Sequence, residues 1–105
     1  RAVSVATATS ITPNSDTSDE VTQVNAQSAG TLTINAPTGT PTDGQKLIIR
    51  ITSTNAQTYS FNAAYSFSTT TPAPTGISAT KTDYIGCIWN ANASVWNVVA
   101  VDQGH

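Results

Sequence analysis

The chain has 105 residues and a formal net charge of -2, and only 10% of its residues are charged. This length is that of one small domain, and four Lys and Arg residues are too few for a nucleic-acid surface, which needs many cations against the phosphates. No run approaches the ~18–20 apolar residues of a membrane-spanning helix, so we expect no membrane insertion.

Branched aliphatic residues indicate the fold class. Val and Ile occur 8 times each, whereas Leu and Met together occur twice, and Thr and Ser supply 30 residues. Branching at Cβ suits strands and disfavours helices, and no window has helical periodicity. The sequence therefore predicts an all-β fold, which we expect to be an antiparallel, jelly-roll-like β-sandwich of about eight short strands over residues 1–105.

The N-terminal half alternates apolar and polar residues between turn signals. Val3 and Val5 share one face of a first segment, 2–9, and a weaker alternation follows at 21–24. Segment 31–36 is the most regular, because every second residue is apolar. These three segments are predicted strands.

The predicted strands after the Pro- and Gly-rich loop 37–44 are more apolar. Segment 46–52 alternates, with Leu47, Ile49 and Ile51 on one face and Ile48 and Arg50 on the other. Further strands are expected at 59–61, 65–67, 81–89 and 95–101.

The last two predicted strands are apolar on both faces. In the first of them, Ile85 and Cys87 alternate with Tyr84 and Ile88. Strands that are hydrophobic on both faces are buried on both, and only 26 residues of the chain are Val, Ile, Leu, Phe, Tyr, Trp or Cys. We therefore expect a homo-oligomer in which copies cover each other's sheets, with a monomeric sandwich as the alternative.

The residues that usually carry catalysis are scarce. Cys87, the one cysteine, lies in an apolar run and is predicted to be a buried, inert thiol, and the one histidine is the last residue, His105. The glycines are scattered singly, so no phosphate-binding loop is present. We expect no enzymatic activity and no cofactor.

An acidic segment is the one candidate for a metal site. Asp16, Asp19 and Glu20, with Asn14 beside them, hold oxygen ligands of the kind that Ca²⁺ prefers. Their spacing does not match an EF-hand, and a solvated loop in which Asp and Ser stabilise turns explains them as well. No metal site is predicted.

Two tryptophans are the candidate contact residues. Trp89 and Trp96 flank the loop 90–94, which contains Asn92. Aromatic rings beside amides stack on sugars, so these three residues are candidates for ligand or interface contacts. A place in the core or in a cross-strand aromatic pair is the alternative.

Two stretches resemble a known family. One runs from Thr31 to Ile51 and contains Asp-Gly-Gln-Lys-Leu before an Ile-rich strand; the other runs from Tyr84 to Gly104 and contains the closing Trp, Val-Ala and Gly. They resemble a β-sandwich domain of tailed-bacteriophage virion proteins, found in tail fibres, needle knobs and head-decoration-type proteins. The resemblance carries no ligand residues.

The resemblance implies a structural role at the virion surface. It implies a homotrimer that is assembled in the bacterial cytoplasm, contacts other virion proteins, and serves either capsid decoration or host attachment, in the latter case with host surface glycans as a further partner. The alternative is a carbohydrate-binding module of a secreted bacterial protein. Because the chain begins with Arg1, we expect a fragment or processed piece, in which residues 1–20 form an N-terminal arm.

Overall fold

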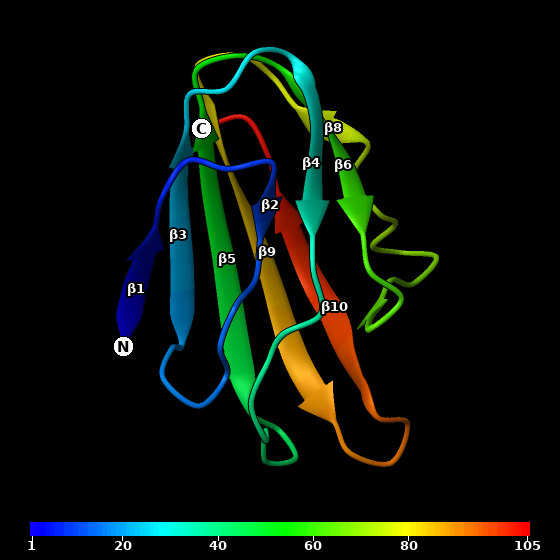
Figure 1. Cartoon of the computed structure of the whole chain (residues 1–105). Coiled ribbons are helices and arrows are strands. Elements are labelled where there is room, and N and C mark those ends of the chain that lie inside the picture. The colour runs from blue at the N-terminus through cyan, green and yellow to red at the C-terminus, as the bar shows by residue number, and fades with distance from the viewer.

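The computed structural model describes residues 1–105 as two β-sheets packed face to face, without helices (Figure 1). The expectation of an all-β fold is thus confirmed. The chain forms ten strands: β1 (Ala2–Val5), β2 (Ser10–Ile11), β3 (Glu20–Asn25), β4 (Gly30–Ile34), β5 (Lys46–Ser53), β6 (Gln57–Phe61), β7 (Tyr65–Ser66), β8 (Gly76–Ile77), β9 (Lys81–Asn90) and β10 (Val95–Asp102).

The chain alternates between the two sheets as it advances. The six-stranded sheet has the order β1-β3-β5-β9-β10-β7, and the four-stranded sheet has the order β2-β4-β6-β8. Each strand up to β8 is therefore followed by a strand of the other sheet, and from β1 to β6 the chain returns to each sheet running in the same direction. As a result β1, β3 and β5 pair in parallel, as do β2, β4 and β6, so the chain winds like a solenoid.

The expectation of an antiparallel jelly roll is wrong. Only β5 with β9, β9 with β10, and β6 with β8 pair antiparallel. Alternation along a strand tells which residues point inward but not which way the neighbouring strand runs, so the sequence pattern left the direction open. The two-residue strands β2 and β8 were too short to show alternation. Residues 1–20, expected as an arm, contribute β1 and β2 to the sheets.

The core lies between the sheets and follows the predicted alternation. Leu32 and Ile34 of β4 and Leu47, Ile49 and Ile51 of β5 have no exposed surface. These five side chains belong to a cluster of 14 buried residues that both sheets supply. Burial of this apolar surface is the main force that holds the two sheets together.

Side-chain amides tie together the turns at the upper end of Figure 1, where the chain crosses from the six-stranded to the four-stranded sheet. Near the end of β3, Gln23 Nε2 and Asn25 Nδ2 donate to the carbonyls of Ala6 (3.0 Å) and Ala8 (2.9 Å) in the preceding turn. One winding later, Asn55 Nδ2 donates to the Gln27 carbonyl at 2.9 Å. At each of these two crossings, side-chain amides thus donate hydrogen bonds to backbone carbonyls of the preceding turn.

A buried carboxylate links the two sheets. Asp83 of β9 is 1% exposed and accepts a 2.8 Å hydrogen bond from the Tyr59 hydroxyl of β6. It also accepts bonds from Gln103 Nε2 (2.9 Å) and the Gly104 amide (3.1 Å), which pin the C-terminal residues. Three donors compensate the cost of burying the charged group.

We predict that Asn25→Leu destabilises the protein by about 2–4 kcal/mol, because the Ala8 carbonyl, the Gln23 side-chain oxygen and the Gln27 amide then lose their partner inside the fold. Urea unfolding measures the change. Ser60→Ala, at an exposed position of β6, is the control and should stay within about 0.5 kcal/mol of wild type. Equal stability of all three proteins would contradict the assigned role of the amide.

Candidate functional site

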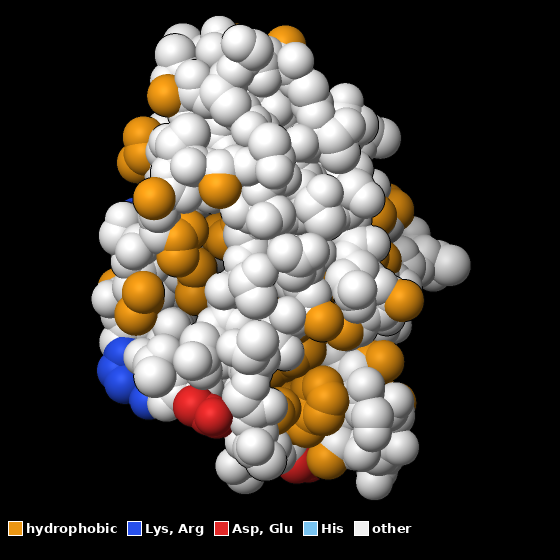
Figure 2. Space-filling model, viewed as in Figure 1, with side chains coloured by type: hydrophobic (Ala, Val, Ile, Leu, Met, Phe, Trp, Pro, Cys, Tyr) orange, Lys and Arg blue, Asp and Glu red, His pale blue; other side chains and the backbone are white.

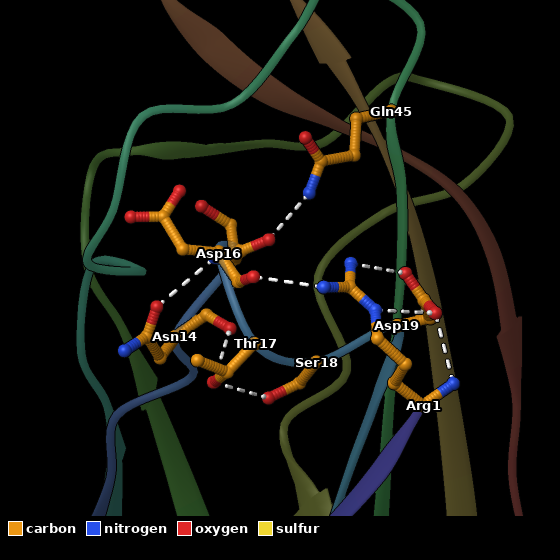
Figure 3. Close-up of polar contacts among 8 residues, drawn as sticks. Arg1, Asn14, Asp16, Thr17, Ser18, Asp19 and Gln45 are labelled. Atoms are coloured by element: carbon orange, nitrogen blue, oxygen red, sulfur yellow. Dashed lines mark hydrogen bonds and ion pairs between the residues drawn. The ribbon is translucent and has the colours of Figure 1, made fainter.

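The acidic loop between β2 and β3 is held by Arg1 (Figure 3). The Arg1 guanidinium donates from Nε and Nη2 to the two Asp19 oxygens at 3.1 and 3.0 Å, and the terminal amine donates to the same carboxylate at 2.8 Å. These hydrogen bonds hold the pKa of Asp19 well below its usual range. A third guanidinium nitrogen donates to the Asp16 carbonyl at 2.8 Å, so one side chain bonds this loop at two positions.

Asp16 faces a different partner from Asp19. Its Oδ1 accepts the amide of Thr40, from the loop between β4 and β5, at 2.9 Å. The close approach of the two loops requires glycine at Gly39, where φ is +96° and a Cβ would lie 2.7 Å from the Ser15 hydroxyl. The carboxylates considered for Ca²⁺ are therefore bonded to different protein donors and do not converge on one point.

The two tryptophans form a pair at the end of the core. They lie directly opposite each other on β9 and β10, with ring centroids 5.3 Å apart. Trp96 is 2% exposed, whereas Trp89 is half-buried. Trp96 thus has no surface for a sugar ring, and only one edge of the pair reaches solvent.

Asn92 lies exposed in the loop of the β9–β10 hairpin. The base of this hairpin is fixed by Asp43, whose Oδ1 accepts the Ala91 amide at 2.9 Å. The structure therefore brings Trp89 and Trp96 together but leaves Asn92 as a separate surface residue.

An uncharged groove runs beside β10. It has two adjoining parts, of about 420 and 360 Å³, which share Thr70 and Thr71. Phe67, the Asn97 amide and Val99 line the first part, and Pro72, Pro74 and Val101 line the second. This groove, rather than the tryptophan pair, is the concave surface against which a neutral ligand could pack.

The outer faces of the two sheets differ in chemistry. On the four-stranded sheet the outward positions are hydroxyl residues or glycine: Ser10, Thr31, Thr33, Thr58, Ser60 and Gly76. Figure 2 shows the middle of this side of the molecule as largely white, with groups of hydrophobic side chains to its left and below it. The six-stranded sheet instead presents Val24, which is 64% exposed, and Ile48, which is 40% exposed, together with the charged side chains of Glu20, Lys46, Arg50 and Asp102.

The polar residues that matter most to this architecture were not identified from the sequence. Gln23 and Asn25 stand in the same alternating series as the buried Val21, so their inward direction was readable, but their partners were not. Asp83 likewise shares its face with Ile85 and Cys87. A polar residue in phase with buried neighbours is the signal that could have found all three.

Comparison with known proteins gives a likeness of fold alone. No protein-family model matches the chain, and no curated protein matches its sequence. A chain in a solved structure described as a chaperone-substrate complex superposes on 95% of this chain with a TM-score of 0.55 and 15% sequence identity. The match spans 17% of the length of that chain, so the likeness concerns one part of a larger molecule.

We predict that Trp96→Ala lowers the free energy of unfolding by about 3–5 kcal/mol, because it leaves a cavity in the core. Trp89→Ala should cost less, since part of that ring is already exposed. Denaturant unfolding of both variants checks the order. A Trp96→Ala protein of wild-type stability would refute the assignment of this ring to the core.

Burial makes Cys87 unreactive. The thiol is 2% exposed, and desolvation raises its pKa to about 12. The neutral thiol is therefore the form that the folded state favours. Because the folded pKa exceeds the unfolded value of about 9, this preference is fully present below pH 9 and is lost as the pH rises towards 12.

We predict that a thiol reagent such as Ellman's reagent modifies Cys87 at pH 8 only after unfolding in urea. Between pH 9 and 11 the stability of wild type should fall relative to Cys87→Val, by at most about 1.4 kcal/mol for each pH unit. Urea titrations over this pH range measure the difference. Fast labelling of the folded protein would show that the thiol is accessible.

Proposed function

We propose that this chain is a non-enzymatic structural module of a tailed-bacteriophage virion, displayed at the particle surface as a homotrimer and serving decoration or attachment. The observation that carries the proposal is the contrast between the outer faces of the two sheets. One face is covered with hydroxyl groups and carries no charge, while the other exposes Val24 and Ile48. A hydroxyl face hydrogen-bonds water, and exposed aliphatic side chains such as Val24 and Ile48 favour contact with protein.

The internal bonding supports a structural role. Every buried side-chain nitrogen and oxygen has a hydrogen-bond partner within the chain. Asp19 is bonded to Arg1, and Asp83 is bonded to Tyr59, Gln103 and Gly104. Such groups position loops and termini, and a fold fixed in this way suits a part that works by its shape.

A carbohydrate-binding module is the second candidate. The groove beside β10 favours it, because that groove combines the Phe67 ring with the Asn97 amide and contains no charged residue. Neutral sugars are recognised by aromatic and amide groups of this kind. In a trimer, three copies of a weak site would gain avidity, so glycan contact is also compatible with the attachment role.

The test has two measurements. Sedimentation of the purified chain should give a species of three times the 10.9 kDa chain mass, and cryo-electron microscopy of particles that contain this polypeptide should place it on the outside of head or tail. A monomer that is absent from particles and titrates with a neutral oligosaccharide would overturn the proposal in favour of the second candidate.

A further inference from the structure

The edge of the six-stranded sheet beside the groove loses its partner strand part-way along β10. β7 pairs with β10 in parallel at Trp96 and Asn97 only. The ladder stops there because the next amide on that side, that of Ser68, donates to the Thr71 carbonyl at 3.2 Å instead. From Val98 onward no backbone hydrogen bond joins β10 to the segment between β7 and β8, and the groove lies between the two.

The register of β9 gives the direction of the backbone groups of β10 beyond that point. The Trp89 amide bonds to the chain just before β5, and alternate residues of an antiparallel strand share their direction. The backbone groups of Cys87 and Ile85 therefore point towards β5. Val98 and Val101 lie opposite them in β10 and so form no bonds with β9. The backbone groups of these two valines point away from β9, towards the groove.

Three of these backbone groups have no partner within the chain. They are the carbonyl of Val98 and the amide and carbonyl of Val101, and none of the backbone hydrogen bonds involves them. Both residues line the groove. An extended chain carries N–H and C=O groups at the spacing of a strand, which is why an unpaired strand edge binds another strand. The pairing of β7 shows that this same edge of β10 accepts a parallel strand.

The walls of the groove fit an uncharged chain. None of the lining residues is charged, so a charged side chain placed there would lose water without gaining a partner. Phe67 forms a fixed wall, because its ring packs against Phe61 with centroids 4.9 Å apart and both rings lie against the core. The β-bulge between Val98 and Ala100 adds Val99, whose side chain is 55% exposed and lines the groove.

We propose that the groove binds an extended, uncharged segment of another polypeptide, which adds to the edge of β10 as a parallel strand and continues the line of β7. The edge from Val98 to Gln103 is about 20 Å long at ~3.3 Å per residue, which suits a strand of about six residues. Main-chain hydrogen bonds to Val98 and Val101 supply the affinity, and Val99 and Phe67 select the side chains.

The unpaired backbone groups favour a peptide over the neutral sugar of the second candidate function. A sugar has no repeating N–H and C=O groups to pair with the edge of a strand, whereas a peptide has both. The inference goes beyond the proposed function and does not depend on the trimer.

The experiment titrates the isotope-labelled full chain with a terminally blocked six-residue peptide of alternating Thr and Val, and follows the amide signals by NMR spectroscopy. The Val101 signal should move downfield and saturate with a Kd below about 1 mM, because this amide gains a carbonyl partner. The same peptide with every backbone nitrogen methylated keeps its side chains but has no donors. It should bind at least about 10-fold more weakly.

Two variants test the site itself. Val99→Asp places a charge in the groove, and Val101→Pro removes the unpaired amide at a position of the kind where an edge strand tolerates proline. Each should weaken binding of the unmethylated peptide at least about 10-fold and keep the circular dichroism of wild type. Thr31→Asp, at an exposed position of the other sheet, is the matched control and should bind like wild type.

The outcomes separate this inference from the proposed function. It is overturned if no signal of the groove saturates up to about 1 mM peptide, if the methylated peptide binds equally well, or if Val99→Asp binds like wild type. A response of the groove to maltohexaose but not to the peptide would assign the groove to the second candidate function instead. None of these results bears on the trimer, which sedimentation tests separately. Should Val101→Pro fail to fold, the comparison of Val99→Asp with Thr31→Asp decides.

Discussion

The structure depends on how the chain satisfies its backbone where it crosses between sheets. Within a sheet, each strand forms backbone hydrogen bonds with its neighbours. A segment that connects the two sheets has no such neighbour, so its carbonyl groups need other donors. Here Gln23, Asn25 and Asn55 supply the missing donors, and each bonds the turn that precedes it. The same amides therefore fix the spacing of successive turns. Without them the parallel register of both sheets would be held by the ladders and the apolar core alone.

Sequence reasoning reached the faces of the strands but not their directions. The alternation of segment 46–52 correctly predicted that Leu47, Ile49 and Ile51 are buried, because a period of two is a local property of a strand. Whether the next strand of the same sheet runs parallel or antiparallel depends on the path of the chain between the two strands. Here that path passes through a strand of the opposite sheet. Segments of β-branched residues fit either direction, so the antiparallel expectation followed a common architecture rather than the residues themselves.

For the candidate site, the sequence likewise indicated which residues would be neighbours within a hairpin but not which distant residues they would contact. The positions of Trp89 and Trp96 around one loop indicated that their rings would meet, and the hairpin register places them opposite each other. Trp96 is buried and Trp89 is half-buried. The residues around each tryptophan give no local signal for this difference. The partners of Asp83 could not be foreseen, because Tyr59 and Gln103 lie 24 and 20 residues away along the chain and meet it only in the folded molecule.

The outer faces of the two sheets show where the β-branched residues outside the small core lie. A chain of this length buries a smaller fraction of its surface than a large domain does, and its 14 buried hydrophobic residues do not include Val24, Ile48 or Val99. Threonine fits a pleated strand as well as valine does and leaves a hydroxyl for water, as the outward positions of β4 and β6 show. Valine and isoleucine at outward positions of β3 and β5 are therefore not needed for strand formation. They lie on the outer side of the six-stranded sheet among the charged side chains of Glu20, Arg50 and Asp102, whereas the outward positions of β4 and β6 are hydroxyl residues.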